Sequence, residues 1–156
     1  MPQAFDTTLI ATLIGAARHS ARRRMNHNFH TALDAPCQRL LIAIEPDSYV
    51  APHRHLDPQK AESLLLVRGT LGAVFFSDDG QISTTLKLSA AGECCGVDIP
   101  AGEYHSVIAL EPGTVFFESK AGPYRPVDPA EFAAWAPREG DAGASAFREQ
   151  LRALFR

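Results

Sequence analysis

The sequence predicts an all-β core, either a sandwich or a barrel, with helices at both ends of the chain. Between residues 38 and 119, about eight short strand-like segments are separated by turn signals such as SDDG, PAGE and EPGT. Before and after this region, apolar residues recur at helical spacing. Because short strands with frequent turns are typical of antiparallel sheets, we expect a sandwich or barrel and not a parallel sheet.

The first segment predicts a helix that begins after Asp6 and ends near residues 18–21. Asp6 is a suitable N-cap, since its carboxylate can accept a hydrogen bond from a free N–H group of the first turn. The apolar positions that follow at helical spacing are Leu9, Ile10, Leu13, Ile14 and Ala17. A polar connector, RRRMNHNFHTALDAP, then leads to the first strand of the core.

The core region divides into short strands joined by tight turns. The predicted strands cover residues 38–44, 49–55, 63–68, 71–77, 83–88, 96–99, 106–110 and 114–119. The segment VFFSDDGQIS is the clearest hairpin, because its turn residues separate two strand-like runs.

The end of the chain favours helices again. Asp128, Pro129 and Glu131 are typical of an N-cap, a first-turn proline and an acid at the third helical position. A last helix is predicted over residues 144–155. Its apolar stripe consists of Phe147, Leu151, Leu154 and Phe155.

These segments predict a single domain, because no repeat, low-complexity tract or linker divides the chain. We expect a helical N-terminal arm (1–36), a β-barrel (37–122) and a helical C-terminal tail (123–156). Hydrophobic residues make up 46% of the chain and charged residues 21%. A chain of this composition can bury a core without disulfides or a structural metal.

The charge of the chain limits its partners. A formal net charge of −3 at pH 7 argues against broad binding of nucleic acid or acidic membranes. Arg22, Arg23 and Arg24 nevertheless form a basic run. A guanidinium group suits phosphate or carboxylate, so the run is either a local anion site or a solvated basic turn.

The start of the chain and its cysteines predict a cytoplasmic location. Asp6 stands where a signal peptide would have basic residues, and the apolar stretch that follows is too short to span a bilayer. Cys37, Cys94 and Cys95 are an odd number without zinc-ribbon spacing, which fits a reducing compartment. We expect the adjacent Cys94 and Cys95 to be small, buried or half-buried residues.

The main site signal is the segment PHRH, in which one residue separates His53 from His55. On a strand, both imidazoles leave the same face and can reach one metal ion. The following LDPQKA favours a turn, so Glu62 can face the imidazoles from the next strand. Far along the chain, the turn residues of PAGEYH place His105 at the start of another strand. The four side chains therefore form a candidate metal site.

Each of these residues alone has a simpler interpretation. A single histidine is more often a surface or core residue than a ligand, and a glutamate before an apolar run is usually a strand-edge charge. The conjunction is more specific, because all four groups lie at strand starts beside turn residues. His27 and His30 are competing ligands, but their connector lacks a third partner at a suitable spacing.

The segments PHRH and PAGEYH, with six residues between Glu62 and Gly69, resemble the two sequence motifs of the cupins. Three features depart from the pattern. The opening glycine is replaced near residues 47–48, the gap from His55 to Glu62 is longer than usual, and Ala109 stands where cupins often have asparagine. The resemblance implies a cupin double-stranded β-helix, a jelly-roll barrel. The metal ligands that it implies are His53, His55, Glu62 and His105.

Further segments resemble the WbuC-type cupin-fold metalloproteins over nearly the whole chain. They are RRRMNHNFH, CQRLLIAIEPDSYVAPHRH, LEPGTVFFESKAGPY and FAAWAPREGD. Members of that group often lie among bacterial O-antigen and capsule polysaccharide genes, which implies a substrate related to surface sugars. Cupin-like domains commonly pair through their sheets, so the resemblance also implies a homodimer.

The donor set indicates the kind of ion. Three imidazole nitrogens and one carboxylate oxygen suit one divalent transition metal, Zn, Fe, Ni, Co or Mn, and do not suit Ca or Mg. On a six-coordinate ion two positions stay open, whereas four ligands could close a zinc site. An open site polarises a carbonyl or lowers the pKa of bound water, which predicts isomerase, lyase, hydrolase or dioxygenase chemistry if the protein is an enzyme.

Other polar residues are candidates for lining the site. Tyr49 lies four residues before His53, on the same face by strand alternation, and is a catalytic candidate. Glu118, in a strand with apolar neighbours, is a candidate base or hydrogen-bond partner of the metal ligands. The candidates for binding an anionic or hydroxyl-rich ligand are Arg39, Asn28 and His30. An ordinary packing or surface role is an equal alternative for each.

The sequence leaves three hypotheses of function. The first is a metal-dependent enzyme that acts on a small polar or anionic substrate. The second is a non-catalytic metallated cupin that binds or senses a small molecule, and the third is a structural zinc protein. The metal-free sugar epimerases of this fold rely on a His/Asp and Tyr constellation, and the complete ligand set argues against that class.

Overall fold

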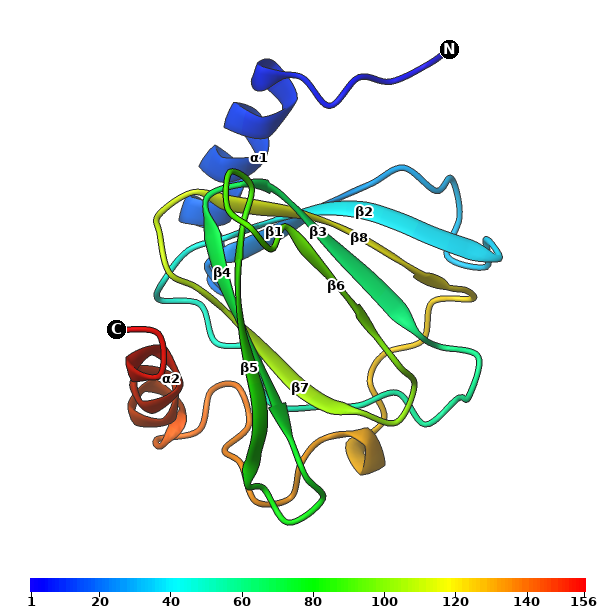
Figure 1. The fold of residues 1–156 in the computed structure, drawn as a ribbon. Helices are drawn as coiled ribbons and strands as arrows, with labels where there is room; N and C mark the ends of the chain where they lie inside the picture. The colour runs from blue at the N-terminus through cyan, green and yellow to red at the C-terminus, as the bar shows by residue number, and fades with distance from the viewer.

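The computed structural model describes all 156 residues and contains two antiparallel β-sheets that face each other (Figure 1). The larger sheet has the strand order β1-β2-β8-β3-β6, and the smaller sheet has the order β5-β4-β7. The strands are β1 (Arg24–Asn28), β2 (Cys37–Ile44), β3 (Glu62–Arg68), β4 (Thr70–Phe76), β5 (Ile82–Ser89), β6 (Gly96–Ile99), β7 (Tyr104–Ala109) and β8 (Thr114–Ala121). The predicted all-β core is confirmed, and β4 and β5 form the expected hairpin.

The main hydrophobic core lies between the two sheets. It contains 13 buried residues, and β2, β3, β4, β7 and β8 all contribute to it. Along β2, Leu40 and Ile42 point into this core, whereas Leu41 and Ala43 point outward and are also buried. This alternation follows from the period of two in a strand, and a strand covered on both faces becomes a nearly continuous apolar run.

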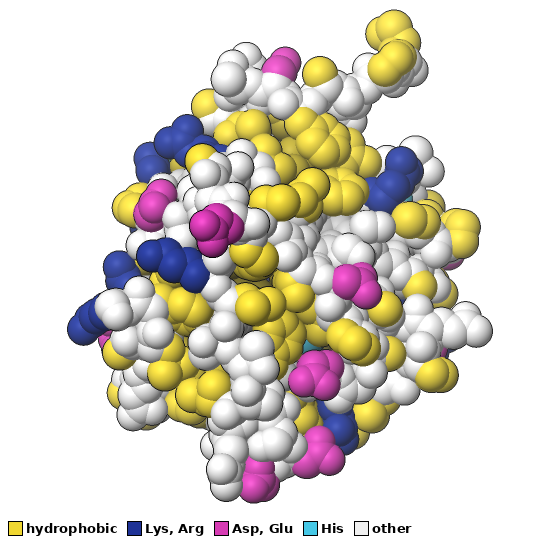
Figure 2. Space-filling view, viewed as in Figure 1, with side chains coloured by type: hydrophobic (Ala, Val, Ile, Leu, Met, Phe, Trp, Pro, Cys, Tyr) yellow, Lys and Arg dark blue, Asp and Glu magenta, His cyan; other side chains and the backbone are white.

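Helix α1 (Thr7–His19) covers the outer face of the larger sheet. Its N-terminus is capped as predicted, because the Leu9 N–H donates to the Asp6 carboxylate at 2.8 Å. Leu13, Ile14 and Ala17 then pack against the outward residues of β2 and β8. Below the N-terminal end of the chain, hydrophobic side chains gather on the surface seen in Figure 2, where charges of both signs are interspersed.

The C-terminal segment differs in part from the predicted pair of helices. Asp128 and Glu131 form the expected capping box, but the turn that they begin, η1 (Pro129–Glu131), stops after three residues. The helical turn ends at Phe132, whose backbone is extended. The next N–H group, of Ala133, donates to the Pro52 carbonyl at 2.9 Å and so cannot donate within a helix. The last helix, α2 (Ala144–Ala153), forms as predicted and packs on the smaller sheet through Leu151.

Two predictions about strands were wrong. Residues 49–55 are extended but form no strand, since their only ladder contacts are the isolated bridges of His53 with His105 and Phe132. Conversely, β1 lies within the segment that we expected to be a polar connector. It pairs with β2 at the edge of the larger sheet.

The three cysteines are free, and only Cys94 packs against the main core. Cys37 and Cys95 are exposed and Cys94 is half-buried, so the expected burial holds only for Cys94. Cys94 and Cys95 precede β6 and are not part of a strand. Neither helix of the structure has the length and apolar character needed to cross a membrane.

Candidate metal centre and cavity

His53 and His105 are held side by side by their backbones. The His53 N–H donates to the His105 carbonyl at 3.1 Å, and the His105 N–H donates to the His53 carbonyl at 2.9 Å. The His55 carbonyl accepts the N–H of Gly102 at 2.8 Å. Gly102 has a φ of 87°, a left-handed conformation that glycine adopts without strain. The turn of the second motif is thus attached directly to the loop of the first.

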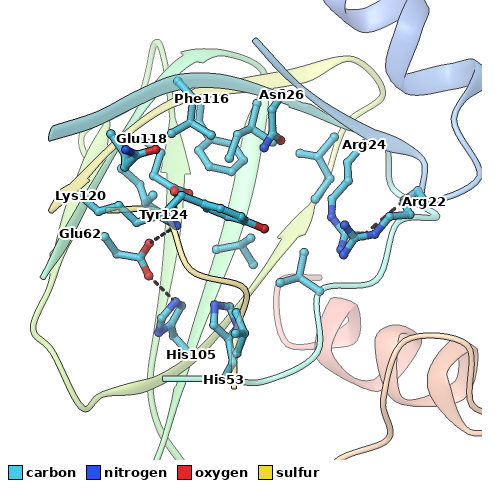
Figure 3. A pocket seen from close by; sticks show the side chains of 18 of the residues that line it. Arg22, Arg24, Asn26, His53, Glu62, His105, Phe116, Glu118, Lys120 and Tyr124 are labelled. Atoms are coloured by element: carbon cyan, nitrogen blue, oxygen red, sulfur yellow. Dashed lines mark hydrogen bonds and ion pairs between the residues drawn. The ribbon is translucent and has the colours of Figure 1, made fainter. Parts of the chain in front are cut away.

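Glu62 reaches the same place from the other sheet. It is the first residue of β3 and pairs with Ile99 of β6 and Lys120 of β8, whereas His105 is the second residue of β7. The strand ends of the two sheets and the loop before β3 therefore bring together the side chains of His53, His55, Glu62 and His105, which we call the donor cluster. Figure 3 shows three of them, His53, Glu62 and His105.

The donor atoms of this cluster converge on the Glu62 carboxylate. Nε2 of His105 lies 2.8 Å from Oε1 of Glu62, and Nε2 of His55 lies 3.4 Å from the same oxygen. One donor atom each from His53, His55 and Glu62 can be chosen so that all three lie within 4.8 Å of one another. The rings of His53 and His105 are 4.6 Å apart between centroids.

The backbone fixes the orientation of two imidazoles. Nδ1 of His53 lies 3.0 Å from the Ala51 carbonyl, and Nδ1 of His105 lies 2.9 Å from the Glu103 carbonyl. Because a carbonyl can only accept, each Nδ1 carries the proton in these contacts. This is the arrangement that commonly orients metal-binding histidines, since it leaves Nε2 as the donor atom.

Burial and charge shift the pKa values within the cluster. Burial lowers the pKa of His53 to about 3, and the charge of His105 adds to this effect, so His53 is neutral at pH 7. Burial opposes ionisation of Glu62, but His105 and His55 hold its pKa well below the usual range. Burial also opposes protonation of His105, yet Glu62 raises the pKa of His105. An ionised carboxylate and a neutral imidazole are the forms that bind metals.

Two buried atoms of the cluster have no hydrogen-bond partner, Nε2 of His55 and Oε1 of Glu62. The two histidine contacts of this oxygen have ion-pair distances without the direction of a hydrogen bond. Leaving a buried polar atom unpaired costs about 1–3 kcal/mol. A cation between these atoms would satisfy both, so the donor set fits a transition-metal ion.

The donor cluster opens onto a cavity of about 640 Å³ between the sheets (Figure 3). His53, Glu62 and His105 line one part of it. Its apolar walls include Leu40, Ile42, Ile44, Leu64, Val107 and Phe116. A cavity of this size with a few polar groups is typical of small-molecule sites.

Glu118 and Lys120 face the cavity from β8. Nζ of Lys120 lies 2.7 Å from Oε1 of Glu118 and 3.8 Å from Oε2 of Glu62. Burial raises the pKa of Glu118, and Lys120 only partly offsets this effect. Burial opposes the charge of Lys120, but Glu118 and Glu62 raise its pKa. The lysine therefore links the two carboxylates.

Another polar cluster of the cavity consists of Arg22, Arg24 and Glu139, which we call the arginine clamp. Both arginines form ion pairs with the Glu139 carboxylate, at 2.7 and 2.9 Å. Burial opposes ionisation of Glu139, but the hydrogen bonds from Arg22 and Arg24 lower its pKa to about 2. All three arginines of the basic run thus pair with carboxylates of the chain, Arg22 and Arg24 with Glu139 and Arg23 with Asp47.

The other predicted site residues divide into two groups. Asn28 and His30 line the cavity. Tyr49 does not: its hydroxyl donates to the Pro137 carbonyl at 2.7 Å, and its ring packs against Phe147. Arg39 is exposed and lies on the outward side of β2, because strand alternation directs its neighbour Leu40 inward. The structure thus brings neither Tyr49 nor Arg39 to the donor cluster.

Several cavity residues were missed from the sequence. They are Asn26, Lys120, Tyr124, Arg138 and Glu139. A signal existed for one of them, since Lys120 continues the inward series of Phe116 and Glu118. Nothing local marks the residues after β8, because their place depends on how the C-terminal segment folds back over the cavity.

Several solved structures share the fold of this protein at low sequence identity. KdgF from Halomonas sp. is 14% identical, with 69% of this chain and 85% of that chain covered and a TM-score of 0.52. A recombinant oxalate oxidase in complex with glycolate is 13% identical, with 70% and 56% covered and a TM-score of 0.53. A variant oxalate decarboxylase from Bacillus subtilis is 15% identical, with 71% and 32% covered and a TM-score of 0.50. The protein has the cupin fold.

The chain belongs to the family described as a domain of unknown function, DUF6016. The family model matches residues 5–88, more than half of the chain, and runs from α1 into β5. The matched region contains three members of the donor cluster, His53, His55 and Glu62. A search of curated proteins finds no match.

Proposed function

We propose that the protein is a metal-dependent cupin enzyme that acts on a small polar or anionic substrate. The proposed ligands are His53, His55, Glu62 and His105. The observation that carries this proposal is the pair of buried, unpartnered atoms, Nε2 of His55 and Oε1 of Glu62. A fold that leaves two such atoms facing each other at 3.4 Å is stabilised by a cation that binds both.

The donor set narrows the ion and the chemistry. Three nitrogens and one carboxylate oxygen support Zn, Fe, Ni, Co or Mn as the bound metal. Such a metal supplies a Lewis acid that polarises a substrate oxygen or lowers the pKa of bound water. Isomerase, lyase and dioxygenase reactions are the classes that we propose for this site.

Glu118 and Lys120 are the residues that we propose for handling a proton. Both side chains face the cavity, and the 2.7 Å contact between them holds the Glu118 carboxyl group in place. Lys120 also steadies the second oxygen of Glu62. From this position Glu118 can take a proton from a substrate in the cavity or return one to it. Tyr49 is not included, because its hydroxyl is bound outside the cavity.

The resemblance to WbuC-type proteins supports a substrate derived from bacterial surface sugars. Amide and phenol groups of Asn26, Asn28 and Tyr124 line the cavity and suit a ligand rich in hydroxyl groups. We propose that the protein works in the cytoplasm as a homodimer. Size-exclusion chromatography with light scattering tests the dimer, and a monomer at micromolar concentration would contradict it.

Metal analysis of single-histidine variants tests the ligand assignment. We expect tag-free protein to contain about one transition-metal ion per chain. In His53→Ala or His105→Ala, metal occupancy should fall to about a tenth or less, because each variant loses an imidazole ligand that the backbone holds in a fixed orientation. The matched control is His19→Ala, which removes an exposed histidine of α1. Full occupancy in both cluster variants would show that the ligands lie elsewhere.

A second measurement separates the enzyme from the alternative of a non-catalytic, metallated ligand-binding cupin. An enzyme needs an exchangeable position on the metal, so cobalt-substituted protein should have the absorption spectrum of a five- or six-coordinate ion. A closed four-coordinate spectrum would count against catalysis. A tight small-molecule complex that yields no product after long incubation would support the binding protein instead.

A further inference from the structure

The arginine clamp places two guanidinium groups around one carboxylate. Arg22 donates three hydrogen bonds to the two oxygens of Glu139, at 2.7, 3.1 and 3.1 Å. Arg24 donates one hydrogen bond to each oxygen, both at 2.9 Å. In Figure 3, Arg22 and Arg24 lie on the side of the cavity away from Glu62 and His105. The cavity therefore has a carboxylate-binding end and a donor-cluster end.

Arg24 is positioned by contacts other than Glu139. Arg22 lies in the turn before β1 and Arg24 is the first residue of β1; both line the cavity, while Arg23 between them pairs with Asp47. Only 14% of the Arg24 side chain is exposed, and its guanidinium also donates to the Ser48 hydroxyl at 3.2 Å. Arg24 is thus held in place whether or not a carboxylate is bound.

Glu139 is held less firmly than Arg24. It lies in the irregular segment between η1 and α2, and 35% of its side chain is exposed. Its carboxylate has no hydrogen-bond partners other than Arg22 and Arg24. A second carboxylate that entered the cavity would compete for the same donors.

The charges around the cavity favour an anionic ligand. The cationic side chains that line it are Arg22, Arg24, Lys120 and Arg138. The carboxylates that line it are Glu62, Glu118 and Glu139. One positive charge is thus in excess before any metal binds, and a divalent ion would add two more. A confined positive potential of this kind raises the local concentration of anions.

We propose that Arg22 and Arg24 form the binding site for the carboxylate of a polyhydroxylated acid, and that Glu139 occupies this site until the ligand displaces it. The inference deepens the proposed function and rests on it for the role of the ligand as a substrate. Glu139 itself demonstrates the chemistry, since paired guanidinium groups match a planar carboxylate. Asn26, Asn28 and Tyr124 of the same cavity supply partners for the hydroxyl groups.

Calorimetric titration with gluconate tests the site, with sorbitol as the uncharged control ligand. We expect gluconate to bind the wild-type protein and sorbitol to bind far more weakly. Arg24→Met should weaken gluconate binding about ten-fold or more, because two charge-assisted hydrogen bonds are lost. The matched control is Arg68→Met, which removes an exposed arginine of β3 that forms no ion pair, and it should bind gluconate like the wild type.

Glu139→Gln gives the sharpest result, because the two interpretations predict opposite signs. If Glu139 is a displaceable competitor, its neutral analogue should bind gluconate several-fold more tightly than the wild type. If the clamp is only a structural ion pair, the variant should bind gluconate no better or more weakly, and this outcome overturns the proposal. Should Arg24→Met fail to fold, as judged by circular dichroism, Glu139→Gln still decides the question.

The titrations are repeated on metal-depleted protein so that the two proposals can fail separately. If the protein takes up no metal but Arg24→Met and Glu139→Gln shift gluconate affinity as expected, only the proposed function fails. If metal binds but neither variant changes the affinity for gluconate, or if no form of the protein binds gluconate, only the proposed carboxylate site is contradicted. Tighter binding of glucose 6-phosphate than of gluconate, with the same dependence on Arg24, would overturn the assignment of a carboxylate and show that the site binds a phosphate.

Discussion

Glu62 and Glu118 are both buried, yet their pKa values move in opposite directions. Burial dominates at Glu118 and raises its pKa, whereas His105 and His55 overcome burial at Glu62 and lower its pKa. A metal ligand must be ionised, while a proton carrier must gain and lose a proton near the working pH. The environments of these two residues therefore support different roles, although Lys120 contacts both.

The pKa of Glu139 predicts a loss of stability in acid. Burial opposes its ionisation, but the hydrogen bonds from Arg22 and Arg24 lower its pKa from 4.5 to about 2. A carboxyl group whose pKa falls on folding stabilises the folded state fully above about pH 4.5, and this contribution is lost as the pH falls towards 2. We expect about 1 kcal/mol, since about a third of the side chain is exposed and solvent screens the pair.

Urea unfolding of wild-type protein and Glu139→Gln at pH 6 and pH 3 measures this contribution. The variant should be less stable at pH 6, and the difference in the free energy of unfolding should shrink at pH 3. Glu93→Gln, which removes an exposed carboxylate without an ion pair, should show no such change. A difference between wild type and Glu139→Gln that stays constant with pH would contradict the assignment.

The strands with an apolar face were predictable, and β1, which presents polar residues to the cavity, was not. Strands such as β4 and β7 carry apolar residues on both faces, so their hydrophobic runs mark them clearly. In β1 the inward residues are Arg24, Asn26 and Asn28, which face the cavity. Every second residue of this strand is therefore polar where a core strand would have an apolar residue. Hydrophobic periodicity cannot detect such a strand, because its inward residues face the cavity and not the apolar core.

The C-terminal end of the fold depends on a close approach at Gly72 of β4. A Cβ atom there would come within 2.4 Å of the Phe155 ring. We therefore expect Gly72→Ala to displace Phe155 and to lower the free energy of unfolding by about 1–3 kcal/mol. Thermal unfolding of the variant measures this loss.

Gly15 of α1 is the matched control. No atom lies within 4 Å of a Cβ built there, and alanine is a better helix former than glycine. Gly15→Ala should raise the free energy of unfolding by about 0.5–1 kcal/mol. If Gly72→Ala were as stabilising as Gly15→Ala, the packing of Phe155 on β4 would be unimportant.

At the scale of the whole molecule, the hydrophobic core and the donor cluster are separate. None of the 13 residues of the main core belongs to the cluster. Chelation should therefore lower the melting temperature while the protein keeps one cooperative transition. The loss should be about 3–4 kcal/mol if the metal is present at 100 to 1,000 times its dissociation constant.

Scanning calorimetry with and without a chelator measures this effect. His53→Ala should melt at the same temperature in both conditions, because it no longer holds the metal. Loss of the cooperative transition on chelation of the wild-type protein would indicate that the metal is structural.

The donor cluster could be predicted because its signal is local. The HxH pair, the following glutamate and the PAGEYH turn each occupy a few consecutive residues, and the barrel brings them together. The contact between Arg24 and Glu139 has no such local signal. Arg24 and Glu139 are 115 residues apart and meet only after the C-terminal segment folds back. Contacts of this kind depend on the whole fold and leave no pattern in a short window of sequence.

The four residues of the donor cluster all lie between positions 53 and 105, whereas the arginine clamp joins positions 22 and 24 to position 139. The segment from 123 to 143 carries Glu139 and also supports the backbone beside the histidines, since the Ala133 N–H donates to the Pro52 carbonyl and the Arg54 N–H donates to the Glu131 carbonyl. A substitution in this one segment would therefore be felt at both ends of the cavity.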